Sequence, residues 1–125
     1  MNYNYKVLIA DDDPEMRDVL RGFLEELGCT VDGEVENGRD AVKQISLIQP
    51  KLCFIDIEMP IKNGLEVLEE IQALSIKTFP IIVSGHSTID NVKLAVGLGA
   101  KGFIVKPYEI DKVKQILEKY SASLP

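Results

Sequence analysis

The chain has 125 residues, of which 46% are hydrophobic, 27% are charged and none is tryptophan, a composition typical of one globular domain. Its net charge of −6 argues against a nucleic-acid-binding surface, because such surfaces take most of their affinity from clustered lysine and arginine. The N-terminus lacks the apolar segment of a signal peptide, and no apolar run is long enough to cross a membrane. We therefore expect a cytoplasmic protein. Cys29 and Cys53 are far apart in the sequence and predict two reduced, packed thiols.

Short apolar segments alternate along the chain with longer amphipathic ones. The segments with strand character are 6–10, 30–35, 52–56, 80–84 and 102–105. Three of them, "VLIA", "LCFI" and "IIV", are apolar at every position, which is typical of central strands covered on both faces. The segment 30–35 alternates imperfectly, which predicts an edge strand.

The segments with helical periodicity are 14–27, 39–49, 65–75, 88–98 and 108–120. In the first, apolar residues at steps of three and four predict one buried face, formed by Met16, Val19, Leu20, Phe23, Leu24 and Leu27. Pro14 suits the first helical position and Gly28 the position after the helix end. Residues 121–125 predict a frayed end or the start of a linker.

Five β–α pairs in strict alternation predict an α/β fold with an open, parallel, five-stranded sheet and right-handed crossovers. A closed barrel would need eight such pairs. We expect a single domain over residues 1–125, with its core at about residues 5–120 and no internal repeat or linker.

Polar residues end four of the predicted strands or directly follow them. In chain order they are Asp11, Asp12 and Asp13, then Asp56, then Ser84, and finally Lys106. Because sites in open parallel sheets form at the carboxyl ends of the strands, the aspartates converge if the first and third strands are neighbours. A hydroxyl and a lysine would then lie at the rim of the same pocket.

Crowded carboxylates raise one another's pKa and weaken a fold unless a cation neutralises them. Oxygen ligands without thiols favour a hard divalent ion, and Mg²⁺ fits best because it needs only a few carboxylates and also binds phosphate oxygens. An aspartate beside such an ion can attack a phosphoryl group, while Lys106 neutralises the developing charge. Asp13 directly precedes Pro14 and suits the helix N-cap, which leaves Asp11 and Asp12 for the metal.

The segments "IADDDPEMR", "CFIDIEMPIKNG", "IIVSGH" and "GAKGFIVKP" occur in this order, each at the end of the appropriate strand. In this respect the chain, from about Lys6 to Tyr120, resembles the receiver domain of bacterial two-component response regulators. The resemblance implies the doubly wound, flavodoxin-like receiver fold with strand order 2-1-3-4-5. It also implies a phosphoprotein that acts in phosphorelay signal transduction.

The resemblance assigns roles to individual residues at the strand ends. It implies that Asp56 is the phosphoacceptor, that Asp12 binds Mg²⁺ directly, and that Asp11 binds it mainly through water. Asp56 itself and the main-chain carbonyl of Glu58 would complete the protein ligands. The side chain of Glu58 leaves the lifetime of the phosphoryl group open.

The remaining roles concern the response to phosphorylation. Ser84 would hydrogen-bond to the phosphoryl group, Lys106 would pair with it, and Phe103 would turn inward as an aromatic switch. The Lys106–Pro107 peptide would be cis. His86, the single histidine, is expected to be an exposed loop residue, with room for an influence on dephosphorylation.

The resemblance also implies the partners. The phosphoryl donor would be a sensor histidine kinase or a histidine phosphotransfer protein, and the output would act on an effector domain or partner protein that the sequence does not identify. We expect no direct nucleic-acid or membrane binding. Catalysis would be limited to phosphorylation and dephosphorylation of the protein's own aspartate. Dimerisation on phosphorylation is left open.

Two other functions are weighed. A phosphatase of the haloacid dehalogenase type also uses a strand-end aspartate and Mg²⁺, but it needs a second aspartate two residues further on, where this chain has Glu58. A receiver-like module that is never phosphorylated would act by binding partners alone. The complete set of strand-end residues argues against it.

Overall fold

A computed structural model describes residues 3–86 and 88–125 of the chain. Its elements alternate strictly between strand and helix. They are β1 (Lys6–Ala10), α1 (Pro14–Glu26), β2 (Thr30–Val35), α2 (Gly38–Ile48), β3 (Leu52–Asp56), α3 (Gly64–Ala73), β4 (Phe79–Ser84), α4 (Ile89–Gly97), β5 (Gly102–Val105) and α5 (Ile110–Ser123).

The strands form one parallel sheet in the order β2-β1-β3-β4-β5, which confirms the predicted topology. The register aligns the strand ends, since Ala10 lies opposite Ile55, Asp56 opposite Val83, and Ser84 opposite Val105. The residues that follow β1, β3, β4 and β5 therefore meet along one edge of the sheet. We call this the carboxyl edge, and we call the opposite edge, where the strands begin, the amino edge.

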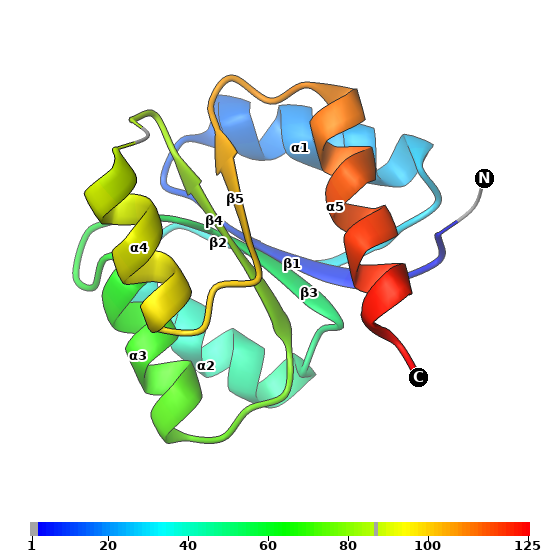
Figure 1. Ribbon diagram of the computed structural model, residues 1–125. Helices are drawn as coiled ribbons and strands as arrows, with labels where there is room; N and C mark the ends of the chain where they lie inside the picture. The colour runs from blue at the N-terminus through cyan, green and yellow to red at the C-terminus, as the bar shows by residue number, and fades with distance from the viewer. Residues whose placement is uncertain (1–2, 87) are drawn as a thin grey trace.

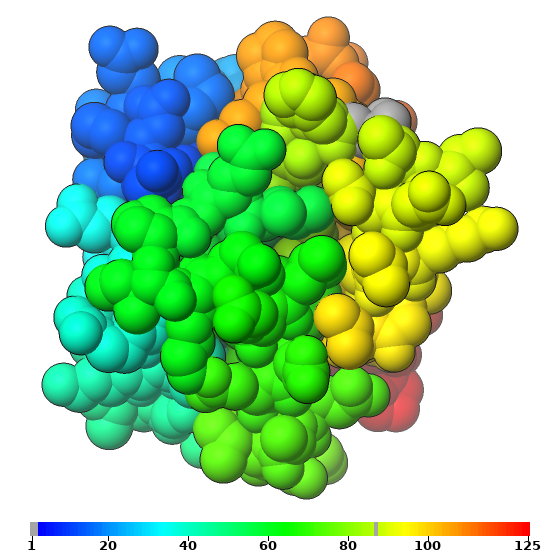
Figure 2. Space-filling model, turned by 90° about the vertical axis from the view of Figure 1, so that its left-hand side faces the viewer, coloured from blue at the N-terminus to red at the C-terminus, as the bar shows by residue number. Residues whose placement is uncertain are grey.

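Helices cover both faces of the sheet. In Figure 1, α1 and α5 lie on one face and α2, α3 and α4 on the other, and Figure 2 looks onto the second face, where these three helices lie side by side. Each face has its own apolar core. Leu20, Leu24, Val113 and Leu117 belong to the first, and Ile45, Val67, Leu68 and Ala95 belong to the second.

The strand predictions agree closely with the structure. Four strands have the predicted bounds, and β4 begins one residue earlier, at Phe79. Every residue of β3 and β4 is buried, as expected for central strands, whereas β2 lies at the sheet edge with alternating exposure. Continuous and alternating apolar patterns thus distinguished central from edge positions.

The first helix begins at Pro14 as predicted and ends at Glu26, one residue before the predicted end. Asp13 is its N-cap and accepts a hydrogen bond from Glu15 N at 3.0 Å, and Pro14 occupies the first turn. Gly28 follows the helix with a φ of +92°, a left-handed conformation that glycine adopts without strain. The expectation for Val19 is wrong, because 39% of this residue is exposed.

The C-terminal helix is longer than predicted. Residues 121–123 continue α5 and are not a frayed end. The Ser121 hydroxyl lies 2.6 Å from the Tyr5 hydroxyl, and the Ser123 hydroxyl donates to the Tyr120 carbonyl. The first contact holds the end of the helix against the residue before β1, which the sequence pattern could not indicate.

Both cysteines are free and buried, as expected. Burial raises the pKa of each thiol, that of Cys53 to about 12, so both stay protonated at neutral pH. Over residues 3–86 and 88–125, no helix combines the length and apolar character needed to span a membrane.

Candidate functional site

Three aspartates converge at the carboxyl edge. Asp11, Asp12 and Asp56 each offer a carboxylate oxygen, and these oxygens all lie within 4.8 Å of one another. Only 1% of Asp11 and 4% of Asp56 is exposed, whereas Asp12 faces solvent. The predicted convergence is confirmed. It arises because β1 and β3 are neighbours in register, so that their ends reach the same point.

Lys106 neutralises part of this charge. Its Nζ lies 2.9 Å from Asp11 Oδ2 and 3.1 Å from Asp56 Oδ2, and the lysine side chain is 19% exposed. The Lys106 main-chain N–H donates to the Ser84 carbonyl, which anchors the residue to the end of β4. The following peptide, Lys106–Pro107, is cis, as predicted. One cation therefore bridges two buried carboxylates, and a net negative charge remains.

The electrostatics of the cluster reflect that imbalance. Burial, together with the Asp11 carboxylate, raises the pKa of Asp56 to about 6, although Lys106 acts in the opposite direction. For Lys106, burial lowers the pKa, but the two carboxylates outweigh it, so that the pKa is raised overall. Asp56 is therefore a buried carboxylate with a strongly perturbed pKa in a cluster that favours an added cation.

Asp11 is held by each of its polar groups. Its main-chain N–H donates to the Val35 carbonyl at 3.0 Å, and its Oδ1 accepts from Asp13 N at 2.9 Å. Its main-chain carbonyl accepts from Arg17 Nη1 at 2.6 Å. Asp13 thus has two tasks, since it caps α1 and also orients the Asp11 carboxylate.

The Ser84 hydroxyl is close to the cluster but is engaged elsewhere. It donates to the His86 carbonyl at 2.7 Å and accepts from the His86 main-chain N–H at 3.0 Å. Ser84 is 3% exposed, whereas His86 is exposed, as expected. The hydroxyl therefore closes a tight turn at the end of β4 in this conformation.

Glu58 and Phe103 lie where the sequence placed them, on the loop after β3 and on β5. The Glu58 side chain is exposed, and its main-chain N–H donates to Asp56 Oδ1 at 3.3 Å. Phe103 is half-buried and packs against the core shared by α2, α3 and α4. It also lines a groove of about 520 Å³ between α4, β5 and α5. Its role as a switch remains a prediction.

Two glycines fix the loop that follows Asp56. A Cβ at Gly64 would lie 2.5 Å from the Asp56 carbonyl oxygen, and one at Gly38 would lie 2.1 Å from the Lys62 carbonyl oxygen. The Gly38 N–H also donates to the Pro60 carbonyl at 3.3 Å. Only glycine allows these close approaches, so the N-termini of α2 and α3 hold the β3–α3 loop in place.

Sequence reasoning missed two residues of the site. Arg17 lies one turn into α1 and reaches back to the Asp11 carbonyl, a side-chain contact for which the sequence carries no signal. Tyr108 is 7% exposed, and burial, followed by the Asp11 and Asp56 carboxylates, raises the pKa of its hydroxyl. Tyr108 therefore stays neutral beside the cluster. The helical periodicity predicted for 108–120 concealed it, because α5 begins only at Ile110.

Comparison with known proteins gives a consistent result. The sequence profile of the family described as "Response regulator receiver domain" matches residues 7–118. The chain is 38% identical over 117 residues to a probable C4-dicarboxylate response regulator, DctR, of Priestia megaterium, and the match covers 93% of the chain and 51% of the relative. It is 36% identical over 116 residues to the chemotaxis protein CheY of Thermotoga maritima, and the match covers 93% of the chain and 97% of that protein.

A solved structure shows the same fold. The CheX–CheY–BeF3–Mg²⁺ complex from Borrelia burgdorferi contains a chain that matches with a TM-score of 0.88 and 27% identity, over 97% of this chain and 90% of that one. The chain spans about half the length of the DctR relatives that it matches. On the sequence profile, the relatives and the strand order together, the chain belongs to the receiver domain family of two-component response regulators.

Proposed function

We propose that Asp56 accepts a phosphoryl group in a Mg²⁺-dependent reaction, with a phosphohistidine of a sensor histidine kinase or phosphotransfer protein as the donor. One observation carries the proposal. Asp56 is a buried strand-end carboxylate that shares Lys106 with Asp11, and Asp12 lies within 4.8 Å. Buried carboxylates at this density weaken a fold unless they serve a reaction or bind a cation.

The residues present fit Mg²⁺. The cluster offers only oxygen donors. The buried Asp11 Oδ2 forms an ion pair with Lys106 and has no hydrogen-bond partner among residues 3–86 and 88–125. Asp11, Asp12, Asp56 and the Glu58 main-chain carbonyl would hold the ion, which matches the preference of Mg²⁺ for a few carboxylates and water. When bound, Mg²⁺ supplies positive charge that offsets the carboxylates and the phosphoryl oxygens. The similar CheY complex from Borrelia burgdorferi contains Mg²⁺.

In the transfer step, a carboxylate oxygen of Asp56 attacks phosphorus. An O–P bond forms while the N–P bond to the donor imidazole breaks, and the electron pair goes to the imidazole nitrogen, which takes a proton from solvent. Lys106 already lies 3.1 Å from Asp56 Oδ2 and can stay close to the phosphoryl oxygens. It thereby stabilises the charge that is spread over them in the transition state.

The response begins at Ser84. To reach a phosphoryl group, its hydroxyl has to leave the His86 main chain, which breaks the 2.7 Å and 3.0 Å hydrogen bonds that now close the turn. That turn leads directly into α4. Phe103 lines the neighbouring groove and can turn inward as Ser84 moves. Phosphorylation would in this way shift a population between two arrangements of α4 and β5.

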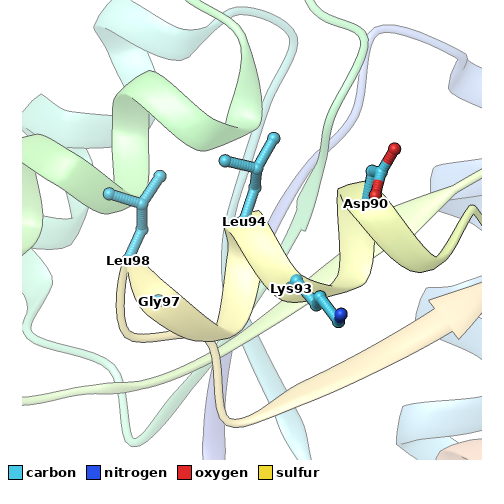
Figure 3. A pocket seen from close by; sticks show the side chains of 5 residues that line it. All are labelled: Asp90, Lys93, Leu94, Gly97 and Leu98. Carbon is cyan, nitrogen blue, oxygen red and sulfur yellow. The ribbon is translucent and has the colours of Figure 1, made fainter.

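The surface of α4 is suited to the output. Three apolar residues of this helix are largely exposed, namely Ile89 at 74%, Leu94 at 54% and Val96 at 61%. Figure 3 shows Leu94 and Leu98 on one side of the helix and Lys93 on another, around a shallow hollow of about 590 Å³. We propose that an effector domain or partner protein, or a second phosphorylated copy, binds at α4, β5 and α5.

The proposed phosphorylation also bears on catalysis, nucleic-acid binding and the cellular location of the protein. The protein would catalyse only the phosphorylation and dephosphorylation of Asp56 and act on no separate substrate. Its net charge of −6 and exposed Glu58 and Asp12 do not favour nucleic acid as a ligand of this domain. We place its action in the cytoplasm, where the catalytic parts of sensor kinases would reach it.

The decisive experiment measures intact mass after incubation with Mg²⁺ and acetyl phosphate. We expect one added phosphoryl group on the wild-type protein, none on Asp56→Ala, and none on the wild type when EDTA replaces Mg²⁺. An adduct that survives in Asp56→Ala would place the reaction at another residue. If the wild type takes up no phosphoryl group from acetyl phosphate or a phosphohistidine donor, the module that binds partners without phosphorylation becomes the better explanation.

A further inference from the structure

Arg17 links the acidic cluster to the sheet edge by a contact that the proposed mechanism does not use. The residue lies in the first turns of α1, and its side chain is 18% exposed. Its Nη1 donates to the Asp11 carbonyl at 2.6 Å, and its Nε lies 3.5 Å from Glu34 Oε1 on β2. The guanidinium group therefore bridges the end of β1 and the neighbouring edge strand.

The Asp11 carbonyl is an informative place for such a contact. The Asp11 N–H already pairs with Val35 of β2, and its Oδ1 accepts from Asp13 N. The carbonyl belongs to the planar peptide group that joins Asp11 to Asp12. A hydrogen bond that fixes this carbonyl therefore fixes the plane from which the Asp12 backbone continues. Asp12 itself is exposed and has no other anchor of this kind among the hydrogen bonds of residues 3–86 and 88–125.

We propose that Arg17 is a positioning residue for the metal site, which holds the Asp11–Asp12 peptide so that the two carboxylates face a shared cation. The inference rests on the proposed binding of Mg²⁺ at this cluster. Groups that orient metal ligands from outside the coordination shell typically change metal affinity about 10- to 100-fold when they are removed. Arg17 would act in this way without touching the metal.

The charge of Arg17 acts in the opposite direction, so the two effects have to be weighed. A guanidinium close to the cluster repels a divalent cation, and its removal would by itself favour Mg²⁺. Here Glu34 lies beside the same group and offsets its charge. Removing Arg17 takes away one positive charge and leaves Glu34 with one partner fewer, so charge alone favours Mg²⁺ in the variant. The positioning role requires that the loss of position outweigh this gain. Removal of Arg17 should therefore weaken Mg²⁺ binding.

Arg21 provides a matched control. It lies one turn further along α1, and its Nη1 also bonds to Glu34, at 2.6 Å, but its polar contacts are with Glu34 and Asp18, not Asp11. The chain lacks tryptophan, so Mg²⁺ binding is followed by isothermal titration calorimetry on the unphosphorylated protein. We expect Arg17→Met to raise the Mg²⁺ dissociation constant about tenfold and Arg21→Met to leave it unchanged. Equal shifts in both variants, or none in either, would overturn the proposal.

Two further variants distinguish loss of the positioning contact from a general loss of structure. Arg17→Lys keeps a cation and a donor and should recover most of the affinity, whereas a loss as large as that in Arg17→Met would overturn the proposal. Glu34→Gln keeps the bond from Arg17 to the Asp11 carbonyl but leaves the guanidinium charge less offset, so it should weaken Mg²⁺ binding by less than Arg17→Met does. Unfolding in EDTA, measured for all variants, shows whether each is folded before titration. If the wild type neither binds Mg²⁺ nor gains a phosphoryl group, the proposed function fails, and the role of Arg17 fails with it.

Discussion

The two edges of the sheet differ in the kind of side chain that they bury. At the carboxyl edge, the strands end in the buried Asp11 and Asp56 carboxylates, which share one lysine. At the amino edge, β1 and β4 begin beside aromatic rings. The Tyr120 ring meets the Tyr5 ring at a centroid distance of 4.8 Å and the Phe79 ring at 5.1 Å, both nearly edge to face. One edge concentrates charge, and the other concentrates apolar contact.

This division teaches how a small parallel sheet can carry a reactive site. The central strands β1, β3 and β4 are apolar over most of their length, and their site residues stand at or directly after the last paired position. The unfavourable electrostatics stay at one edge, where a cation or a phosphoryl group can relieve them. Stability comes from the core and from the amino edge. Changes at the two edges should therefore have separable effects on stability and on phosphorylation.

The largest effect on stability is expected at the amino edge. Tyr120 is 8% exposed and contacts two other rings, so Tyr120→Ala should lower the free energy of unfolding by about 3 kcal/mol. Tyr120→Phe is the control, because it keeps the ring. Denaturant unfolding measures both variants. Folded Tyr120→Ala should still take up one phosphoryl group in the mass assay, and its failure to do so would contradict the separation of the two edges.

The next largest effect is expected at the carboxyl edge, where an added methyl group would clash with the backbone. A Cβ at Gly64 would lie 2.5 Å from the Asp56 carbonyl oxygen, and backbone there cannot yield as a flexible side chain can. Gly64→Ala should therefore cost about 2 kcal/mol of stability and also slow phosphoryl uptake, because it displaces the phosphoacceptor. The control is Gly22→Ala in α1, where an added Cβ would meet no atom of the described residues within 4 Å beyond its chain neighbours and the helix's own backbone. That variant should be up to about 1 kcal/mol more stable and phosphorylate normally.

The third prediction concerns pH and needs Mg²⁺ to be absent. Burial, with help from Asp11, raises the pKa of Asp56 to about 6 in the folded protein, above the value of about 3.9 expected in the unfolded chain. The folded state therefore binds this proton more tightly, and the ionised group destabilises the fold above about pH 6. Asp56→Asn should be roughly 1–2 kcal/mol more stable than the wild type at about pH 8.

That advantage should shrink as the pH falls from about 6 to about 4, and should be lost below about 3.9, where the wild-type carboxyl becomes protonated in both states. Thermal unfolding of both proteins in EDTA across this range is the measurement. Lys106 keeps its ion pair with Asp11 in the variant, so the difference between the two curves reports on Asp56. A constant difference across the range would show that Asp56 does not titrate there.

The sequence allowed the fold to be predicted because each element carries a local signal. Continuous apolar runs marked β1, β3 and β4 as central, and the Asp13–Pro14 pair marked the start of α1. The strand order itself came from the resemblance to receiver domains, since periodicity does not encode which strands are neighbours. The extension of α5 to Ser123 escaped prediction because it depends on a contact with Tyr5, more than 100 residues away in the chain.

Some features of the site could also be predicted from the sequence, whereas others depend on contacts in three dimensions. Carboxylates and a lysine at strand ends can be read from the sequence, because strand direction places them at one edge. The contact of Arg17 with a main-chain carbonyl could not be read, since it depends on how a side chain folds back along its own helix. Nor could the engagement of Ser84 with His86, which is a property of one conformation of a turn.

The smallest predicted change in stability comes from relieving backbone strain, which also differs between the two edges. The positive-φ residues Asn4, Gln49 and Ser75 lie near the amino edge and are polar, whereas Ile61 is β-branched, has a φ of +72° and lies in the loop after β3. A β-branched residue there is strained, and 62% of this side chain is exposed, so little packing compensates. Ile61→Gly should raise stability by about 0.5–1 kcal/mol, since relief of strain outweighs the greater entropy of unfolded glycine.

Ile61→Ala is the matched control, because it removes the exposed side chain but keeps a Cβ in the left-handed region. Thermal unfolding in EDTA should rank Ile61→Gly above Ile61→Ala, with Ile61→Ala at or below the wild type. Equal stabilisation by both variants would assign the effect to the exposed apolar surface. If instead neither variant is more stable, the loop beside Asp56 stores no strain, and charge alone would separate the two edges of the sheet.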